Sequence, residues 1–137
     1  MADTGWTKEE IYLLAERGYA FYLQGCYEEA AIIFEGVLAI EPRHAYCRTA
    51  LSAVYLAMGD AQRAARELTA LLEQNPADYE ARARRCEAYC DLGRWSEARQ
   101  DLAVLQRNGE RYHVPRLTWR LQAGGAGLTT ERRQATS

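Results

Sequence analysis

Apolar residues recur along this chain at the spacing of amphipathic helices. In residues 8–24 they return every three or four positions, and the same spacing reappears in the segments that follow. Thr7 precedes the first of these segments and Glu10 lies three residues later, which is the pattern of a helix-capping box. Gly25 follows the segment and is expected to end the helix in a left-handed conformation. The pattern predicts an all-α chain of helices joined by short turns.

The helical segments repeat with a period of 34 residues. Residues of the same kind occupy equivalent positions: Gly25, Gly59 and Gly93; Ala30, Ala64 and Ala98; Phe34, Leu68 and Leu102; Phe21, Tyr55 and Tyr89; Pro42 and Pro76. A fixed period of this size indicates a repeat array. We predict three helix-turn-helix repeats, at about 11–44, 45–78 and 79–112. Small residues (Gly18, Ser52 and Cys86) share another position, where paired helices should approach closely.

The period and the order Gly, Ala, Phe or Leu, Pro resemble those of the tetratricopeptide repeat (TPR) family. That resemblance implies a TPR α-solenoid in which the first helix of each repeat lines a concave groove. The third repeat departs from the pattern, because Glu110 stands where the closing proline is expected and Asn108-Gly109 supplies the stop instead.

The flanking segments have their own expected roles. Residues 1–10 form a lead-in and helix cap. Residues 113–122 are predicted to be a short capping helix, since the last repeat of a solenoid must cover its apolar face. Residues 123–137 contain no apolar period and are expected to be a disordered tail.

Composition narrows the class of protein. The 137 residues are 48% hydrophobic and 26% charged, with a net charge of −2. No apolar run is long enough to span a membrane, and no secretory signal is evident, so we predict a cytoplasmic protein. A pI near 5.7 and the lack of a basic face argue against nucleic-acid binding. Sixteen arginines against one lysine suggest a bacterial genome.

Charge is distributed unevenly. Residues 1–41 contain eight acidic residues against two basic ones, whereas residues 111–137 contain five arginines against one glutamate. Such asymmetry could orient a partner or pair two copies head to tail as a homodimer. We favour the simpler interpretation, solvated faces and a basic tail.

No catalytic motif or cofactor motif stands out, and we predict that the chain is not an enzyme. It lacks a Ser–His–Asp or Cys–His set placed by a motif, a glycine-rich phosphate loop and an HExxH sequence. Cys86 and Cys90 lie one helical turn apart, as two metal ligands could. His44 and His113 lie in connections elsewhere, so packing is favoured over metal or redox chemistry for these cysteines. No metal or other cofactor is expected.

The resemblance assigns the groove to particular residues. Repeat by repeat they are Tyr12, Ala15, Tyr19 and Tyr22; Tyr46, Thr49, Ala53 and Leu56; and Glu80, Ala83, Arg84, Glu87, Cys90 and Asp91. The first two sets are aromatic or apolar and the third is acidic, which implies binding of an apolar or extended segment of another protein. The tyrosines of the first repeat could equally cover the end of the solenoid. The Arg82-Arg84-Arg85 cluster could contact phosphate, but an intrahelical charge network is favoured.

Two TPR subfamilies offer more specific functions. Cochaperones that hold the C-terminal carboxylate of heat-shock proteins use a clamp of Lys, Asn and Arg. Here Ala15, Tyr19 and Ala50 occupy clamp positions and only Arg84 matches, which argues against that function. The length, the Tyr-rich first helix and the short capping helix resemble the small TPR chaperones of type III secretion, which hold an apolar segment of an exported protein. The alternative is a structural adaptor that binds through its convex face or its termini.

Overall fold

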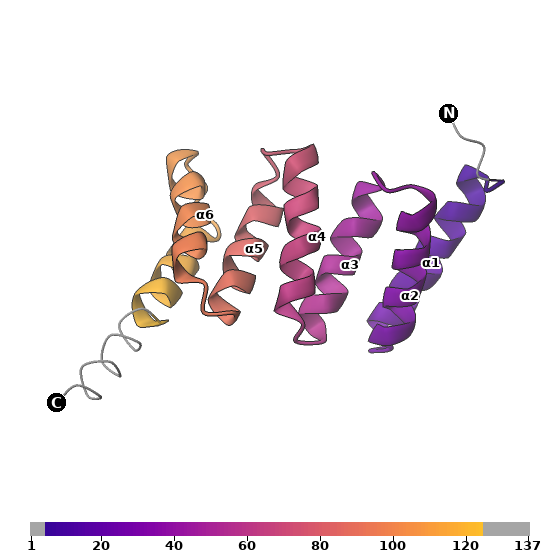
Figure 1. Ribbon diagram of the computed structural model, residues 1–137, viewed down its shortest axis with the longest axis horizontal. Coiled ribbons are helices and arrows are strands. Elements are labelled where there is room, and N and C mark those ends of the chain that lie inside the picture. The colour runs from indigo at the N-terminus through magenta and orange to yellow at the C-terminus, as the bar shows by residue number, and fades with distance from the viewer. Residues whose placement is uncertain (1–4, 125–137) are drawn as a thin grey trace. The chain divides into compact units, whose positions relative to one another are not determined.

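The computed structural model describes residues 5–124, whose regular structure is entirely helical (Figure 1). The helices are α1 (Lys8–Leu23), α2 (Tyr27–Ile40), α3 (Ala45–Ala57), α4 (Ala61–Gln74), α5 (Tyr79–Asp91) and α6 (Trp95–Arg107). They pack in consecutive pairs, α1 with α2, α3 with α4 and α5 with α6. The all-α class and the three helix-turn-helix repeats are therefore confirmed. No described helix has the length and apolar character needed to cross a membrane.

A further helix covers residues 114–124, where a capping helix was expected at 113–122. It extends two residues past the expected end, so Ala123 and Gly124 are helical although they were assigned to a disordered tail. The rest of that expected tail, 125–137, and the first four residues of the lead-in lie outside the described residues.

The helix ends follow the local signals in the sequence. The Thr7 hydroxyl accepts a hydrogen bond from the Glu10 N–H, and the Glu10 carboxylate accepts one from the Thr7 N–H, which confirms the capping box. Gly25, Gly59 and Gly93 follow the first helix of each pair with φ of 78°, 78° and 71°. Glycine adopts this left-handed conformation without steric cost, so each first helix ends at its predicted turn.

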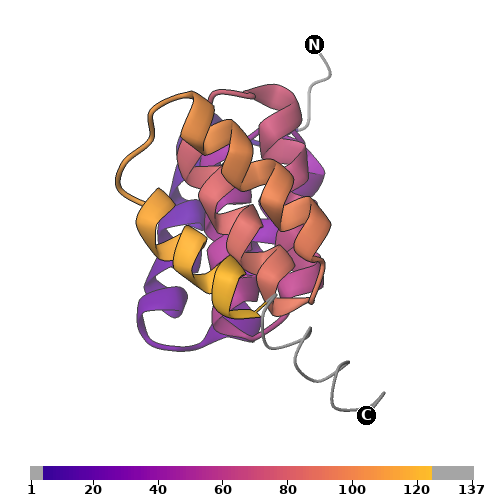
Figure 2. The same cartoon turned by 90° about the vertical axis from the view of Figure 1, so that its left-hand side faces the viewer.

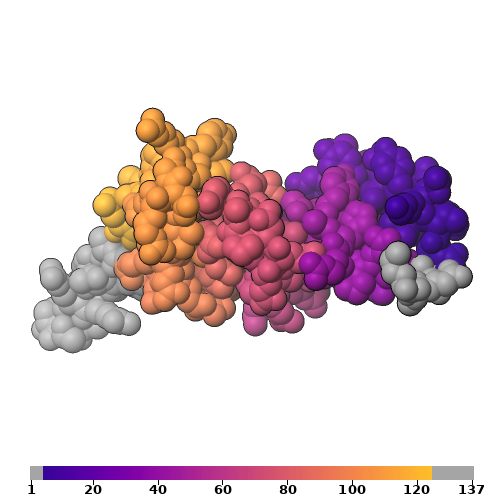
Figure 3. Space-filling model, turned by 90° about the horizontal axis from the view of Figure 1, so that it is seen from above, coloured from indigo at the N-terminus to yellow at the C-terminus, as the bar shows by residue number. Residues whose placement is uncertain are grey.

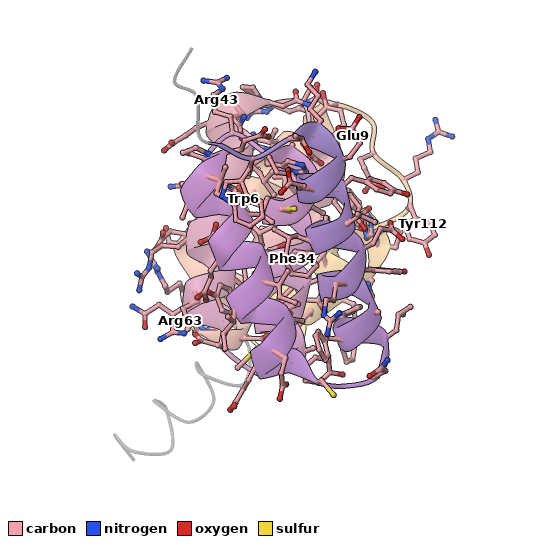
Figure 4. All side chains as sticks on the ribbon, turned by 90° about the vertical axis from the view of Figure 1, so that its right-hand side faces the viewer. Trp6, Glu9, Phe34, Arg43, Arg63 and Tyr112 are labelled. Carbon is pink, nitrogen blue, oxygen red and sulfur yellow. The ribbon has the colours of Figure 1, made fainter. Side chains whose placement is uncertain are left out.

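Small residues allow the two helices of a pair to approach. Ala30, Ala64 and Ala98 are completely buried, as are Ser52 and Cys86. A Cβ atom added at Gly18 would lie 2.9 Å from the Phe34 ring, closer than van der Waals contact allows. Figure 4 shows Phe34 between the ribbons of α1 and α2. The predicted small-residue positions are thus where the paired helices meet.

The chain divides into two compact units. The first extends through Asn75 and contains α1 to α4, with α2 packed against α3 as well as against α1. Its buried core includes Phe34, Val37, Leu51 and Val54. The second begins at Pro76 and contains α5, α6 and the helix at 114–124, which lies beside them in Figure 2. Leu105 and Leu117 are fully buried in this unit.

The arginines of α5 pair mainly with α6, which corrects the predicted intrahelical network. Arg82 and Arg85 both bind the buried carboxylate of Asp101, with Arg85 Nη2 2.6 Å from Asp101 Oδ1. Arg84 forms an intrahelical pair with Glu80. The same arrangement occurs one repeat earlier, where Arg48 pairs with Glu67. Helical periodicity does not predict these contacts, because the acidic partner lies 16 to 19 residues away, on the second helix of the repeat.

Glu110 caps the last helix. Its carboxylate accepts hydrogen bonds from the backbone N–H groups of Tyr112, His113 and Val114. These N–H groups lie where the helix at 114–124 starts, and the first N–H groups of a helix have no partner within it. The residue that breaks the proline pattern therefore specifies the start of the next helix.

Candidate functional site

A surface cavity of about 440 Å³ lies in the first unit, between α1 and the start of α3. Its lining residues are Lys8, Ile11, Tyr12, Ala15 and Glu16 of α1, Glu41 and His44 of the α2–α3 connection, and Tyr46 of α3. Ile11 and Ala15 are buried and belong to the core of this unit. The exposed tyrosines at 12 and 46 border this apolar floor. The cavity thus combines an apolar base with aromatic and charged side chains around it.

Exposed aromatic rings continue from the cavity along α1. Tyr12, Tyr19 and Tyr46 are 63%, 43% and 50% exposed. The ring centroids of Tyr19 and Tyr22 are 6.2 Å apart, and those of Tyr22 and Tyr27 are 5.8 Å apart. Figure 3 colours the surface of α1 and α2 from indigo to purple. Tyr22 is half-buried, so it supports this surface while the other three tyrosines present accessible rings.

The acidic side chains of the cavity affect the pKa values of neighbouring groups. Burial and then the nearby carboxylate of Glu16 raise the pKa of Tyr46. Burial and then Glu41 raise the pKa of the Cys47 thiol to about 11. The Nδ1 atom of His44 accepts a hydrogen bond from the Cys47 N–H and thereby caps α3. A ring nitrogen that accepts a hydrogen bond carries no proton, so this imidazole adds no positive charge to the cavity.

The structure brings together only part of the predicted groove. Tyr12, Ala15 and Tyr46 line the cavity, and Tyr19 and Tyr22 lie further along α1. Thr49, Ala53 and Leu56 are partly buried on α3. Ala15, Ala83 and Cys90 are buried, and of these three only Ala15 lines the described cavity, as part of its floor. The repeat register placed them on the correct helices, but it does not say how deeply a small side chain lies beneath its neighbours.

The acidic residues of α5 have partners in the last helix and in His113 directly before it, so the third repeat does not present the free acidic groove that was expected. His113 Nε2 lies 2.7 Å from Glu80, and Arg116 lies 2.9 Å from Glu87. Arg120 pairs with both Glu87 and Asp91. Partial burial opposes ionisation of Glu80, but its hydrogen bond to His113 and the charges of His113 and Arg84 lower its pKa overall. Each of these three acids therefore has a partner among residues 113–120.

The cysteines contribute to packing. Cys86 Sγ donates a hydrogen bond to the carbonyl oxygen of Ala98 at 3.3 Å. Burial raises the pKa of Cys86 to about 12 and also raises the pKa of Cys90. A thiolate is the nucleophile and metal-binding form of cysteine, and this environment disfavours it. Within residues 5–124, no three His, Cys, Asp or Glu side chains are grouped to hold a metal ion.

Several residues of the site were not anticipated. Lys8, Ile11, Glu16, Glu41 and His44 line the cavity, yet none was assigned to the groove. Only His44 had a local signal, its position directly before a helix. Glu41 and His44 come from the connection between repeats, and helix periodicity does not predict where the residues of a connection lie.

Comparison with known proteins identifies the type of repeat. Residues 55–113 match a family model described as "Tetratricopeptide repeat". No curated protein matches the sequence. Among solved structures, yeast Tom70 is similar with a TM-score of 0.79 and 23% identity, over 92% of this chain and 26% of Tom70. The chain thus spans about a quarter of that protein.

Two solved structures of comparable length are also similar. The first TPR of Spaghetti (RPAP3), bound to the HSP90 peptide SRMEEVD, has a TM-score of 0.75 and 20% identity over 93% of this chain and 99% of that one. The Yersinia enterocolitica type III secretion translocator chaperone SycD has a TM-score of 0.76 and 17% identity over 90% of this chain and 89% of that one. At these identities the likeness establishes the fold.

Proposed function

We propose that this chain, a tetratricopeptide repeat protein by its fold and by residues 55–113, binds a segment of another protein on the α1–α3 face of its first unit. The observation that carries the proposal is the cavity bordered by the exposed rings of Tyr12 and Tyr46. Tyrosine side chains give a large contact area at low conformational cost, and a concave, partly apolar surface is suited to an inserted side chain. The chain acts by binding and not by catalysis.

The similar RPAP3 structure holds an acidic peptide, SRMEEVD. The positions that would supply a carboxylate clamp here are poorly suited to one. Ala15 is buried, Tyr19 has no charge, and Arg84 is paired with Glu80. We therefore propose an apolar or extended segment as the ligand and not an acidic C-terminus.

A chaperone of type III secretion is the more specific form of this function that we propose. Its support is the fold shared with SycD, the Tyr-rich first helix and the arginine-rich composition. Such a chaperone would work in the cytoplasm. The second candidate is an adaptor that binds outside the cavity, through the convex face or the termini. Leu13 and Ile32 favour it, because both are exposed apolar residues outside the cavity.

A paired-variant capture experiment separates the two functions. The tagged full chain, Tyr12→Asp/Tyr46→Asp and Leu13→Asp/Ile32→Asp would each be used to recover proteins from the native cell, quantified by mass spectrometry. Loss of an abundant partner from the tyrosine variant alone supports binding at the cavity. Loss from the Leu13/Ile32 variant alone overturns it in favour of the adaptor. Unchanged circular dichroism melts establish that both variants fold. Tyr22 is unsuitable for this test, because it is half-buried and its substitution would also disturb packing.

A further inference from the structure

The carboxylates of the cavity lack cationic partners. Neither Glu16 nor Glu41 forms an ion pair with any described residue, and both are exposed. Lys8 is the one cationic side chain in the lining, and it too has no ion pair within the described chain. Since His44 is neutral, the lining carries two negative charges against one positive. The local imbalance has the same sign as the acidic excess of residues 1–41.

Several aromatic rings of the molecule have an arginine side chain over their face, but the two tyrosine rings of the cavity do not have such a partner among the described residues. Arg17 lies over Phe21, Arg63 over Tyr55, and both Arg85 and Arg94 over Tyr89, within 5.8 Å of the ring centroids. A guanidinium at this distance is attracted to the negative face of the ring. Among the described residues, no arginine or lysine lies over Tyr12 or Tyr46.

In the second unit, the acidic side chains on the first helix of the repeat are paired with side chains of the same chain. Glu80, Glu87 and Asp91 on α5 are met by His113, Arg116 and Arg120 of the last segment. The first unit has no equivalent basic helix beside Glu16 and Glu41 among its described residues. A basic group placed in the cavity would supply both missing interactions, the ion pair and the cation–π contact.

We propose that the cavity receives an arginine or lysine side chain of the partner segment. The cation would lie between the rings of Tyr12 and Tyr46 and close to Glu16 and Glu41, while its aliphatic stem covers Ile11 and Ala15. This inference rests on the proposed function and adds to it a chemical requirement. The partner segment carries a basic residue among its apolar ones.

The test uses small probes and the full chain. N-acetyl-arginine methylamide is titrated into the ¹⁵N-labelled protein, with N-acetyl-citrulline methylamide and N-acetyl-glutamate methylamide as isosteric-neutral and acidic comparisons. We expect saturable shifts of the amides of Tyr12, Glu16 and Tyr46 with the arginine probe and much smaller ones with the other two. Equal shifts with citrulline, stronger binding of the glutamate probe, or no saturable shift with arginine would each overturn the proposal.

Charge-matched variants locate the interaction. Glu16→Gln/Glu41→Gln should weaken binding of the arginine probe by about tenfold, as expected for the loss of two partly exposed charge contacts. Glu28→Gln/Glu29→Gln removes the same charge from exposed positions on α2 outside the cavity and should leave the affinity unchanged. Equal weakening by the two variants would indicate a general charge effect and contradict the assignment.

The capture experiment distinguishes failure of this inference from failure of the proposed function. If Tyr12→Asp/Tyr46→Asp loses the partner while Glu16→Gln/Glu41→Gln retains it fully, the binding face stands and the cation assignment is wrong. If the arginine probe binds at the cavity but the tyrosine variant retains every partner, the cation site stands and the proposed function is wrong.

Discussion

Single residues decide how closely the paired helices approach. Gly18 and Gly36 illustrate the point, because both lie inside helices of the same pair but in different surroundings. An added Cβ atom would meet the fully buried Phe34 ring at Gly18 and would meet nothing within 4 Å at Gly36. The same substitution should therefore have opposite effects at the two positions.

We expect Gly18→Ala to destabilise the protein by about 1 kcal/mol, because the cost of overpacking exceeds the gain in helix propensity. Gly36→Ala should stabilise it by about 0.5–1 kcal/mol, since only the propensity gain remains. Urea unfolding followed by circular dichroism measures both free energies of unfolding. A stabilising Gly18→Ala would contradict the close contact between α1 and Phe34.

The period of the sequence predicted the Gly18 contact but not the cavity. Gly18, Ser52 and Cys86 are small at the same repeat position, so the contact can be read from periodicity. Glu16 and Glu41 are 25 residues apart and occupy unrelated repeat positions, so no spacing rule connects them. Only the packing of α1 beside the connection before α3 places both in one cavity.

At the scale of the helices, ion pairs connect the two helices of the second repeat, α3 and α4, and the two helices of the third repeat, α5 and α6. Arg48 and Arg82 are equivalent positions, as are Glu67 and Asp101. Each arginine also donates to the carbonyl oxygen of the preceding proline, Pro42 or Pro76. The helix pair and the turn that precedes it are thereby tied by one side chain.

Asp101 is the most buried member of these pairs, with 2% of its surface exposed. Asp101→Asn should cost about 3 kcal/mol, because two partly buried arginines would lose their counter-charge. Glu97→Gln on the same helix removes an exposed pair with Arg94 and should cost less than about 1 kcal/mol. Denaturant unfolding of both variants gives the comparison. Equal losses would mean that burial does not strengthen the Asp101 pairs.

The stability of the whole molecule should respond to pH through the contact between Glu80 of α5 and His113, which directly precedes the last helix. The folded-state pKa of Glu80 is lowered, so its ionised form stabilises the protein above the unfolded pKa of about 4.3. This contribution should disappear as the pH falls through the lowered folded pKa. The difference in Tm between the wild type and Glu80→Gln should therefore shrink steadily as the pH is lowered from about 6 to about 3.

Glu73→Gln provides the control, because Glu73 is exposed and has no ion pair with any described residue. Its Tm difference from the wild type should stay near zero across this range. A Glu80 difference that grows toward acidic pH would have the wrong sign for a lowered pKa and would contradict the role given to His113.

The first helices of the second and third repeats, α3 and α5, start 34 residues apart, at 45 and 79. A fourth repeat with the same period would start its first helix at 113, and the last helix starts one residue later, at 114. Arg116 likewise falls 34 residues after Arg82. The cap can thus be regarded as the opening of a further repeat, started by Glu110 in place of a proline. For protein engineering, this makes the chain extensible: a duplicate of residues 79–112 inserted before 113 would meet the same cap in the same phase and lengthen the array by one unit.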